Sequence, residues 1–274
     1  MKYCKILILF LLIFCFGCVQ GQPDANPDNE NMVALPNLEG MSREQIANKL
    51  DKLGLKYTFI TESKKYHSDN ELDKFIKYGK NFEKYDRVEV GSHLYIYTTA
   101  LPLPKEDIVD VDMDFEYYGK TFIDDGYEEV TLVRSVDGDT AHFYTQDNTY
   151  IKVRFLGVDT PESTIEKEAW GKAAANFTKE ILENAYKIVI EAEGNTQDTY
   201  GRYLAFVWYK ETEQSEFKLL NLEIIKNAYS NSKISSKSKY YDAFFDTEVE
   251  IMKTGRRVWG EIDPNYDYDR KEFK

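Results

Sequence analysis

Hydrophobic and polar residues follow a helical and then an alternating pattern in the first part of the chain. Apolar residues spaced three and four apart predict a helix that begins with the capping-box pair Ser42 and Gln45 and ends at Gly54. Alternation of apolar and polar residues then predicts strands over 55–60 and 92–99. These elements predict a small αβ module, which we place at residues 33–99.

A denser alternating pattern begins near residue 129, with a turn at Asp137-Gly138 between its first two strands. The predicted strands cover 130–136, 141–146, 150–158, 187–192 and 203–209. The predicted helices cover 166–185, 220–228 and 240–253. Five strands with an inserted long helix favour an OB-fold. We therefore expect a mixed α+β, multidomain chain whose C-terminal part, at 129–263, is a five-stranded β-barrel with three helices.

The remaining segments lack such patterns. Residues 1–18 read as a signal peptide, because their apolar run is too short to span a bilayer but typical of an export signal. Residues 19–32 are polar and contain Pro and Asn, which predicts a flexible tether. We expect 100–128 to be a linker, whose aspartates form a solvated face, and 264–274 to be a C-terminal tail.

The three cysteines all lie within the first eighteen residues, so the rest of the chain has neither a disulfide nor a cysteine metal site. The end of the signal, at Cys18, resembles the lipobox of bacterial lipoproteins. The resemblance implies that Cys18 is lipidated and anchors the exported protein to the cell membrane, facing outside. Secretion after cleavage nearby and an uncleaved anchor are the alternatives.

Three motifs follow one another in the small module: L-P-N-L-E-G-M-S precedes the helix, G-L-K-Y opens one strand and G-S-H-L-Y-I-Y opens another. Their order resembles the PASTA module of bacterial wall-associated proteins. The resemblance implies contact with peptidoglycan. The family's Q-x-P-x-x-G segment is absent, and 77–87 stands in its place, so a spacer or scaffold role is the alternative.

Charge and histidine content exclude several functions. The chain has 35 Lys plus Arg against 48 Asp plus Glu, a net charge of −13, which excludes a polycation that coats nucleic acid by bulk charge. Its three histidines lack metal-binding spacing, which argues against His-metal hydrolases and against Ser-His-Asp or Cys-His triads. Carboxylates and arginines are the groups left for chemistry.

Four short strings in the barrel region concentrate these groups: V-D-G-D-T, V-R-F-L-G, V-D-T-P-E and D-T-Y-G-R, over 136–140, 153–157, 158–162 and 198–202. Each string alone has a structural interpretation as a turn, a strand charge or a helix start. Together they offer two hard carboxylates, from Asp139 and Asp159, and the backbone carbonyl of Thr160. Such oxygens suit Ca²⁺ or Mg²⁺.

The same strings provide groups for phosphate chemistry. Arg154 and Arg202 can each bind a phosphate through two parallel hydrogen bonds and offset the charge that develops during attack on a phosphodiester. Glu162 can align or deprotonate the attacking water without a histidine. The set predicts a metal-assisted phosphodiester hydrolase.

In this order, the strings closely resemble the staphylococcal nuclease (thermonuclease) family from 130 to about 261. The resemblance implies that Asp139, Asp159 and the Thr160 carbonyl bind Ca²⁺. It implies that Arg154 and Arg202 hold the scissile phosphate and that Glu162 is the candidate base. It also implies cleavage of DNA and RNA at the bond to the 5′-oxygen, leaving 3′-phosphate ends.

Two departures bear on substrate binding. Thr199 stands where the family has Lys, although the substrate-contacting Tyr200 is kept. The family's pair of base-packing tyrosines falls on Ile234 and Ser236, with Tyr240 and Tyr241 close by in sequence. Base preference is therefore left open.

We expect a monomeric, extracytoplasmic, calcium-dependent nuclease with low sequence specificity and with DNA and RNA as substrates. A non-catalytic nucleic-acid-binding barrel and a wall adhesin that acts through the small module are the alternatives. Four lysines near the end of the barrel form either a substrate track or a solvated face: Lys226, Lys233, Lys237 and Lys239.

Overall fold

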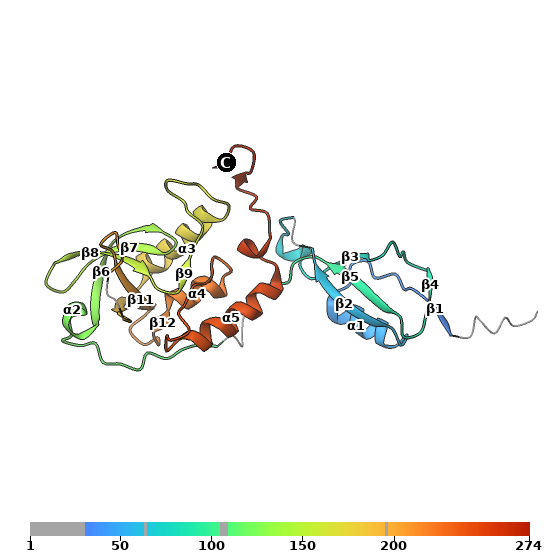
Figure 1. The fold of residues 1–274 in the computed structure, drawn as a ribbon, viewed down its shortest axis with the longest axis horizontal. Helices are drawn as coiled ribbons and strands as arrows, with labels where there is room; N and C mark the ends of the chain where they lie inside the picture. Colours follow the sequence, from blue (N-terminus) through green and yellow to red (C-terminus); the bar gives the residue numbers. More distant parts are fainter. Residues whose placement is uncertain (1–30, 63–64, 105–108, 195–196) are drawn as a thin grey trace, which may run out of the picture.

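The computed structural model describes residues 31–62, 65–104, 109–194 and 197–274, which form an N-terminal module and a larger barrel body (Figure 1). Cys18, the signal and nearly all of the predicted tether lie outside the described residues. Within the described ranges, no helix is both long and apolar enough to cross a membrane.

The N-terminal module contains one helix and two small sheets. Strands β2 (Lys56–Thr61), β5 (His93–Thr98) and β3 (Phe75–Tyr78) form a sheet in that order, with β2 parallel and β3 antiparallel to β5. Strands β1 (Met32–Ala34) and β4 (Arg87–Glu89) form a second, two-stranded sheet, and a 3₁₀ turn covers Asp69–Glu71. The predicted αβ composition of this region is confirmed.

Helix α1 (Arg43–Asp51) begins at the predicted capping box. The side chain of Ser42 accepts the N–H of Gln45, and the side chain of Gln45 accepts the N–H of Ser42 at 3.0 Å. The helix buries Ile46 and Leu50 against a core that includes Leu94. Capping satisfies two N–H groups that the first helical turn leaves without partners, which fixes where the helix starts.

The barrel body is built on five strands that close on themselves. Strand β10 pairs with both β6 and β11, so the sheet order β10-β6-β7-β8-β11 returns to β10. The parallel pair is β8 with β11, and the other pairs are antiparallel. These strands are β6 (Tyr127–Asp137), β7 (Thr140–Tyr144), β8 (Tyr150–Phe155), β10 (Lys187–Glu191) and β11 (Tyr203–Lys210). The predicted closed five-stranded barrel is confirmed.

Several short strands pair with the barrel strands or with each other. Strand β12 (Lys218–Leu219) pairs with β11, and β9 (Val158–Asp159) pairs with β13 (Asn231–Ser232). Near the C-terminus, β14 (Tyr266–Asp267) and β15 (Glu272–Phe273) form a hairpin. The β9–β13 pair matters most for the site, because it fixes the segment that carries Asp159.

Three helices pack on the barrel body, as predicted: α3 (Gly171–Asn184), α4 (Leu220–Lys226) and α5 (Tyr241–Thr254). A short helix α2 (Phe122–Asp125) precedes β6, and a 3₁₀ turn covers Arg257–Trp259. The predicted start of the long helix at residue 166 is wrong, because 166–170 belong to a loop. The N–H of Glu168 donates to the carbonyl of Glu162 at 2.9 Å, and Trp170 has a φ of +69°.

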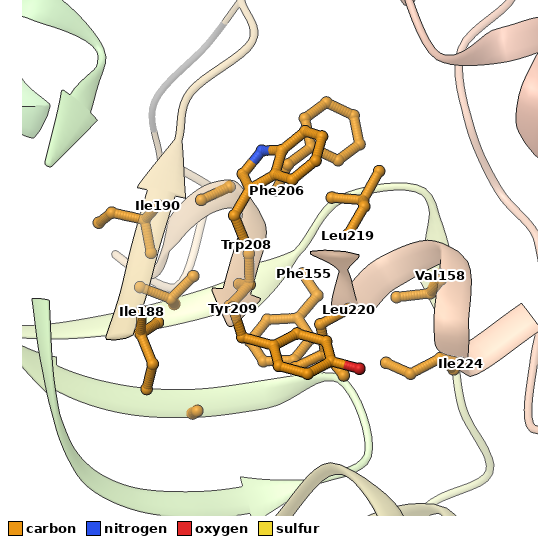
Figure 2. Packing of buried hydrophobic residues seen from close by; sticks show 14 of the residues in the cluster. Phe155, Val158, Ile188, Ile190, Phe206, Trp208, Tyr209, Leu219, Leu220 and Ile224 are labelled. Atoms are coloured by element: carbon orange, nitrogen blue, oxygen red, sulfur yellow. The ribbon is translucent and has the colours of Figure 1, made fainter. Parts of the chain in front are cut away.

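The barrel core is rich in aromatic residues. Figure 2 shows Phe206, Trp208 and Tyr209 of β11 among aliphatic side chains of β10 and α4. The indole N–H of Trp208 donates to Glu191 at 2.8 Å, so this buried donor has a partner. Such packing holds the strand ends that carry the candidate site.

Residues 109–117, here called the acidic strap, run along the barrel body (Figure 1). Alternate apolar side chains of the strap pack against the barrel core, namely Val111, Met113, Phe115 and Tyr117. Between them, Asp110 pairs with Lys226, and Asp114 pairs with Lys239 at 3.0 Å. These aspartates are exposed, as the predicted solvated face requires, and two of them also pair with lysines of the barrel.

Candidate active site

Asp139 lies in the tight turn between β6 and β7 and is only 2% exposed. One carboxylate oxygen accepts the N–H of Thr160 at 2.8 Å and the hydroxyl of Thr160 at 3.1 Å. The other accepts the hydroxyl of Thr140 at 3.0 Å. These bonds hold Asp139 and Thr160, which are far apart in sequence, in one rigid unit.

The turn residue Gly138 makes this approach possible. A Cβ at this position would lie 2.6 Å from the hydroxyl oxygen of Thr160 and 2.9 Å from Cβ of Ala174 on α3. Its carbonyl also accepts the hydroxyl of Thr178 at 2.6 Å. The glycine of the V-D-G-D-T string is therefore required by close packing against Thr160 and α3.

Asp159 is positioned by backbone pairing between distant segments. It lies on β9 opposite Asn231 of β13, and its N–H donates to the hydroxyl of Ser230 at 2.8 Å. Its side chain is 57% exposed. The site therefore has one buried carboxylate, Asp139, and one that faces solvent, Asp159.

Arg154 of β8 joins the two carboxylates. One terminal nitrogen contacts Asp139, and the other donates to Asp159 at 2.6 Å. Burial of the guanidinium lowers its pKa from the ordinary value, and the charge of Asp159 acts in the opposite direction. Asp139, Arg154, Asp159 and Thr160 are thus brought together as the sequence predicted, with Arg154 bridging the two carboxylates.

Arg202 precedes β11, the strand that runs parallel to β8 and places Leu204 opposite Arg154. The charge of Arg202 contributes to the lowered pKa of Arg154, so the two guanidinium groups are close enough to repel each other. Two neighbouring cations that repel each other favour an anion between them.

A carboxylate that the sequence analysis did not assign to the site holds Arg202. Asp198 accepts the side-chain Nε–H of Arg202 at 2.7 Å and its backbone N–H at 2.9 Å. The spacing of Asp198 and Arg202, four residues apart across a turn, was the available signal. Tyr200, in that turn, is 83% exposed, and its ring centroid lies 5.6 Å from the Arg202 guanidinium carbon.

Glu162 lies beside Asp137, a second carboxylate that the sequence analysis did not assign. Desolvation, followed by the hydrogen bond and charge of Asp137, raises the pKa of Glu162 to about 7. Asp137 is buried and accepts the N–H of Gly138 at 2.9 Å and that of Ser163 at 3.3 Å. A carboxyl group with a pKa near neutrality can exchange a proton at physiological pH.

The loop that follows Glu162 is held from the C-terminal end of the chain. The backbone N–H of Trp170 donates to Asp263 at 2.7 Å, and its indole N–H donates to the carbonyl of Glu261 at 2.9 Å. The hydroxyl of Tyr266 on β14 donates to the carbonyl of Lys167 at 2.7 Å. Local sequence patterns could not reveal these contacts, because about ninety residues separate the partners in the chain.

The two tyrosines near the expected base-packing position do not form a free pair. Tyr240 is buried, and its hydroxyl donates to Glu191 at 2.8 Å, so it belongs to the core. Tyr241 stacks on Phe245 of the same helix with ring centroids 6.0 Å apart. Ile234 packs against the barrel core. Among these residues, none offers the family's pair of rings to a base.

The donor set at Asp139, Asp159 and Thr160 fits a hard cation. Two carboxylates face one guanidinium, so a net charge of −1 remains at this point, and carboxylate and carbonyl oxygens are the usual ligands of Ca²⁺. Among the described residues, no group of three or more His, Cys, Asp or Glu side chains forms a metal cluster. A cation here would therefore depend on the main-chain carbonyl and water beside the two carboxylates.

Comparison with known proteins agrees with this geometry. Residues 152–261 match the family of staphylococcal nuclease homologues, a range that contains Arg154, Asp159, Glu162 and Arg202 and begins after Asp139. The chain is 31% identical over 136 residues to a thermonuclease of Staphylococcus intermedius, which covers 48% of this chain and 76% of that protein.

Two further relatives have similar identity. A thermonuclease of Staphylococcus hyicus is 29% identical over 132 residues, or 47% of this chain and 73% of that protein. An SPbeta prophage-derived endonuclease of Bacillus subtilis is 33% identical over 135 residues, or 48% of this chain and 44% of that protein. With the barrel and the gathered strings, these matches show that the chain belongs to the staphylococcal nuclease family.

Proposed function

We propose that this protein is an extracytoplasmic, calcium-dependent nuclease that hydrolyses DNA and RNA with low sequence specificity and leaves 3′-phosphate ends. The observation that carries the proposal is the position of Arg154, which contacts both Asp139 and Asp159 beside Arg202 and Glu162. Family membership and the names of the relatives, thermonucleases and endonucleases, support the same reaction class.

In this proposal, the two arginines bind the scissile phosphate. A guanidinium has five N–H donors, and the contacts with Asp139 and Asp159 leave further donors of Arg154 for phosphate oxygens. Arg202 lies just before the neighbouring strand β11 and is oriented by Asp198. Both charges stabilise the five-coordinate phosphorus, which carries more negative charge than the substrate.

Glu162 is the group proposed to take or order the proton of the attacking water. Its raised pKa means that its carboxylate form is present from about neutral pH upward, where it can accept a proton. Water oxygen bonds to phosphorus, the bond to the 5′-oxygen breaks, and the 3′-oxygen keeps the phosphate. Calcium bound by Asp139, Asp159 and the Thr160 carbonyl would neutralise phosphate charge.

Digestion of plasmid DNA and of RNA tests this function. With Ca²⁺, the full chain should degrade both substrates, and EGTA should stop it. Arg154→Ala and Arg202→Ala should each reduce the rate by about 100-fold or more, the scale seen when one group that stabilises the transition state is removed. Arg87→Ala, in the N-terminal module, is the matched control and should keep full activity.

Full activity in EGTA would reject the calcium-dependent nuclease. Gel retardation of DNA without cleavage in Ca²⁺ would instead favour a binding protein. Both outcomes are read from the same gels, which makes this the first experiment to do.

The membrane anchor and the wall contact are part of the same proposal. Support comes from the short apolar run before Cys18 and from the PASTA-like order of motifs in the N-terminal module. Labelled fatty acid should enter the protein in bacterial cells, and Cys18→Ser should abolish the label. Sedimentation with insoluble peptidoglycan tests the wall contact.

A further inference from the structure

One face of the N-terminal sheet carries two aromatic rings, of which Tyr95 is exposed and Tyr97 is half-buried. Leu94 and Ile96 of β5 point into the module core, so the alternation of the strand places Tyr95 and Tyr97 on the opposite face. Tyr95 is 39% exposed. Successive residues on one face of a strand lie about 7 Å apart, so two rings are presented side by side.

Two lysines accompany these rings. Lys77 of β3 lies opposite Tyr97, with its ammonium nitrogen 4.9 Å from the ring centroid. The ammonium nitrogen of Lys80 lies 5.6 Å from the ring centroid of Tyr95. We call Tyr95, Tyr97, Lys77 and Lys80 the tyrosine–lysine face.

Gly79 lies against the two tyrosines of the tyrosine–lysine face. Its N–H donates to the carbonyl of Tyr95 at 2.8 Å, so its backbone lies directly beside that residue. A Cβ at Gly79 would come within 2.9 Å of Cβ of Tyr95 and 3.3 Å of the ring of Tyr97. A side chain here would push against both tyrosines, so glycine lets Tyr95 and the ring of Tyr97 lie close to this backbone.

The charge of the module differs from that of the whole chain. Residues 33–99 contain 11 Lys plus Arg and 10 Asp plus Glu, whereas the chain has a net charge of −13. The excess of acidic residues in the chain therefore lies outside this module. On the tyrosine–lysine face itself, Glu62 partly neutralises Lys77 at 3.4 Å, and no ion pair involves Lys80 among the described residues.

We propose that the tyrosine–lysine face binds single-stranded nucleic acid. Bases stack on the rings of Tyr95 and Tyr97, while Lys77 and Lys80 contact the phosphates, a combination by which single strands are bound without sequence preference. A duplex keeps its bases stacked inside and cannot use the rings in this way. The lysines favour a polyanion over a neutral glycan chain.

Fluorescence anisotropy of a labelled oligothymidylate tests the proposal. The full chain, in detergent and EGTA, carries Arg202→Ala in every sample so that the barrel site contributes little and does not cleave. Tyr95→Ala should weaken binding about tenfold, whereas Tyr95→Phe, which keeps the ring, should stay within about twofold. Tyr85→Ala removes a tyrosine that is 67% exposed elsewhere in the module and should have no effect.

The salt dependence of binding separates a phosphate contact from a structural effect. Lys80→Ala should lower the slope of log affinity against log salt by about 0.7, the value for one phosphate contact on a single strand. Lys52→Ala, just beyond the end of α1, should leave the slope unchanged. An oligouridylate should behave like the DNA probe, because stacking does not require a particular sugar.

Unchanged affinity in both Tyr95→Ala and Lys80→Ala would overturn the proposal. So would variants that stop sedimenting with insoluble peptidoglycan but keep their affinity for the oligonucleotide, since the face would then bind glycan. Binding at this face needs neither calcium nor cleavage. The digestion assay therefore tests the proposed nuclease activity alone. The anisotropy measurement tests binding at the tyrosine–lysine face alone.

Discussion

Asp263, near the C-terminus, accepts the backbone N–H of Trp170 at 2.7 Å and so closes the loop that begins at Glu162. Tyr266 adds a second contact, to the carbonyl of Lys167. The C-terminal segment is thus tied to the loop that carries the candidate base.

Tyr266→Phe should therefore lower kcat about three- to tenfold while KM stays within about twofold, because small displacements of a catalytic group are costly. Limited proteolysis within 163–169 should become faster. Arg270→Ala, an exposed change in the same hairpin, is the control. An unchanged kcat with faster proteolysis would mean that the loop is held for stability alone.

The pH dependence of the reaction should report the pair formed by Asp137 and Glu162. Glu162 acts as a base only when deprotonated, so kcat/KM should rise with pH through its pKa, which desolvation and Asp137 raise to about 7. Asp137→Asn removes a negative charge that raises this pKa, so the acid limb should move to lower pH. The measurement is kcat/KM from pH 5 to 9 at one saturating calcium concentration.

An acid limb that stays in place in Asp137→Asn would contradict this assignment. Glu162→Gln should remove the limb together with most of the activity. Asp269→Asn, in the exposed turn of the C-terminal hairpin, is the control for loss of one acidic charge and should leave the profile unchanged.

Gly138→Ala should destabilise the fold without touching a charged group. Its Cβ would lie 2.6 Å from the hydroxyl oxygen of Thr160, and the turn cannot shift without moving Asp139. We expect a loss of about 1–3 kcal/mol in the free energy of unfolding, the usual cost of overpacking. Thermal or urea unfolding in EGTA measures it.

The same variant should also need more calcium for half-maximal activity, because Asp139 and Thr160 are both proposed ligands. Thr160→Ser keeps the hydroxyl and the carbonyl and provides the comparison. Equal stability of Gly138→Ala and the parent protein would show that the turn adapts without strain.

Asp198→Asn should weaken the contact that orients the guanidinium of Arg202 without removing the arginine itself. Burial alone would raise the pKa of Asp198, but hydrogen bonds from Arg202 and from the N–H of Tyr200 keep it below its usual value, so the carboxylate is charged when it orients the guanidinium. Without that charge, kcat/KM should fall about tenfold. The measurement is kcat/KM on DNA in saturating calcium, and Asp242→Asn, on α5, is the control.

The sequence predicts much of this arrangement because its signals are local. A capping box fixes the start of α1, and alternation reveals all five barrel strands. The four charged strings were enough to predict that Asp139, Arg154, Asp159 and Thr160 lie together, because each string sits at the end of a strand.

The parts that were not predicted depend on contacts between distant residues. The loop before α3 looks helical in sequence, and only the bonds between Glu162 and Glu168 show that the chain turns there. The roles of Asp137 and Asp263 depend on partners that lie 25 or more residues away. No periodic pattern carries such information.

The acidic strap has a consequence for the boundaries of the catalytic body. Four of its side chains pack on the barrel core, so a shortened protein that begins at residue 129 would expose the surface they cover to water. A shortened protein that begins near residue 109 would keep this surface covered by the strap. Cleavage by a protease between 101 and 104 would therefore leave a C-terminal fragment that keeps the strap and its packing on the barrel.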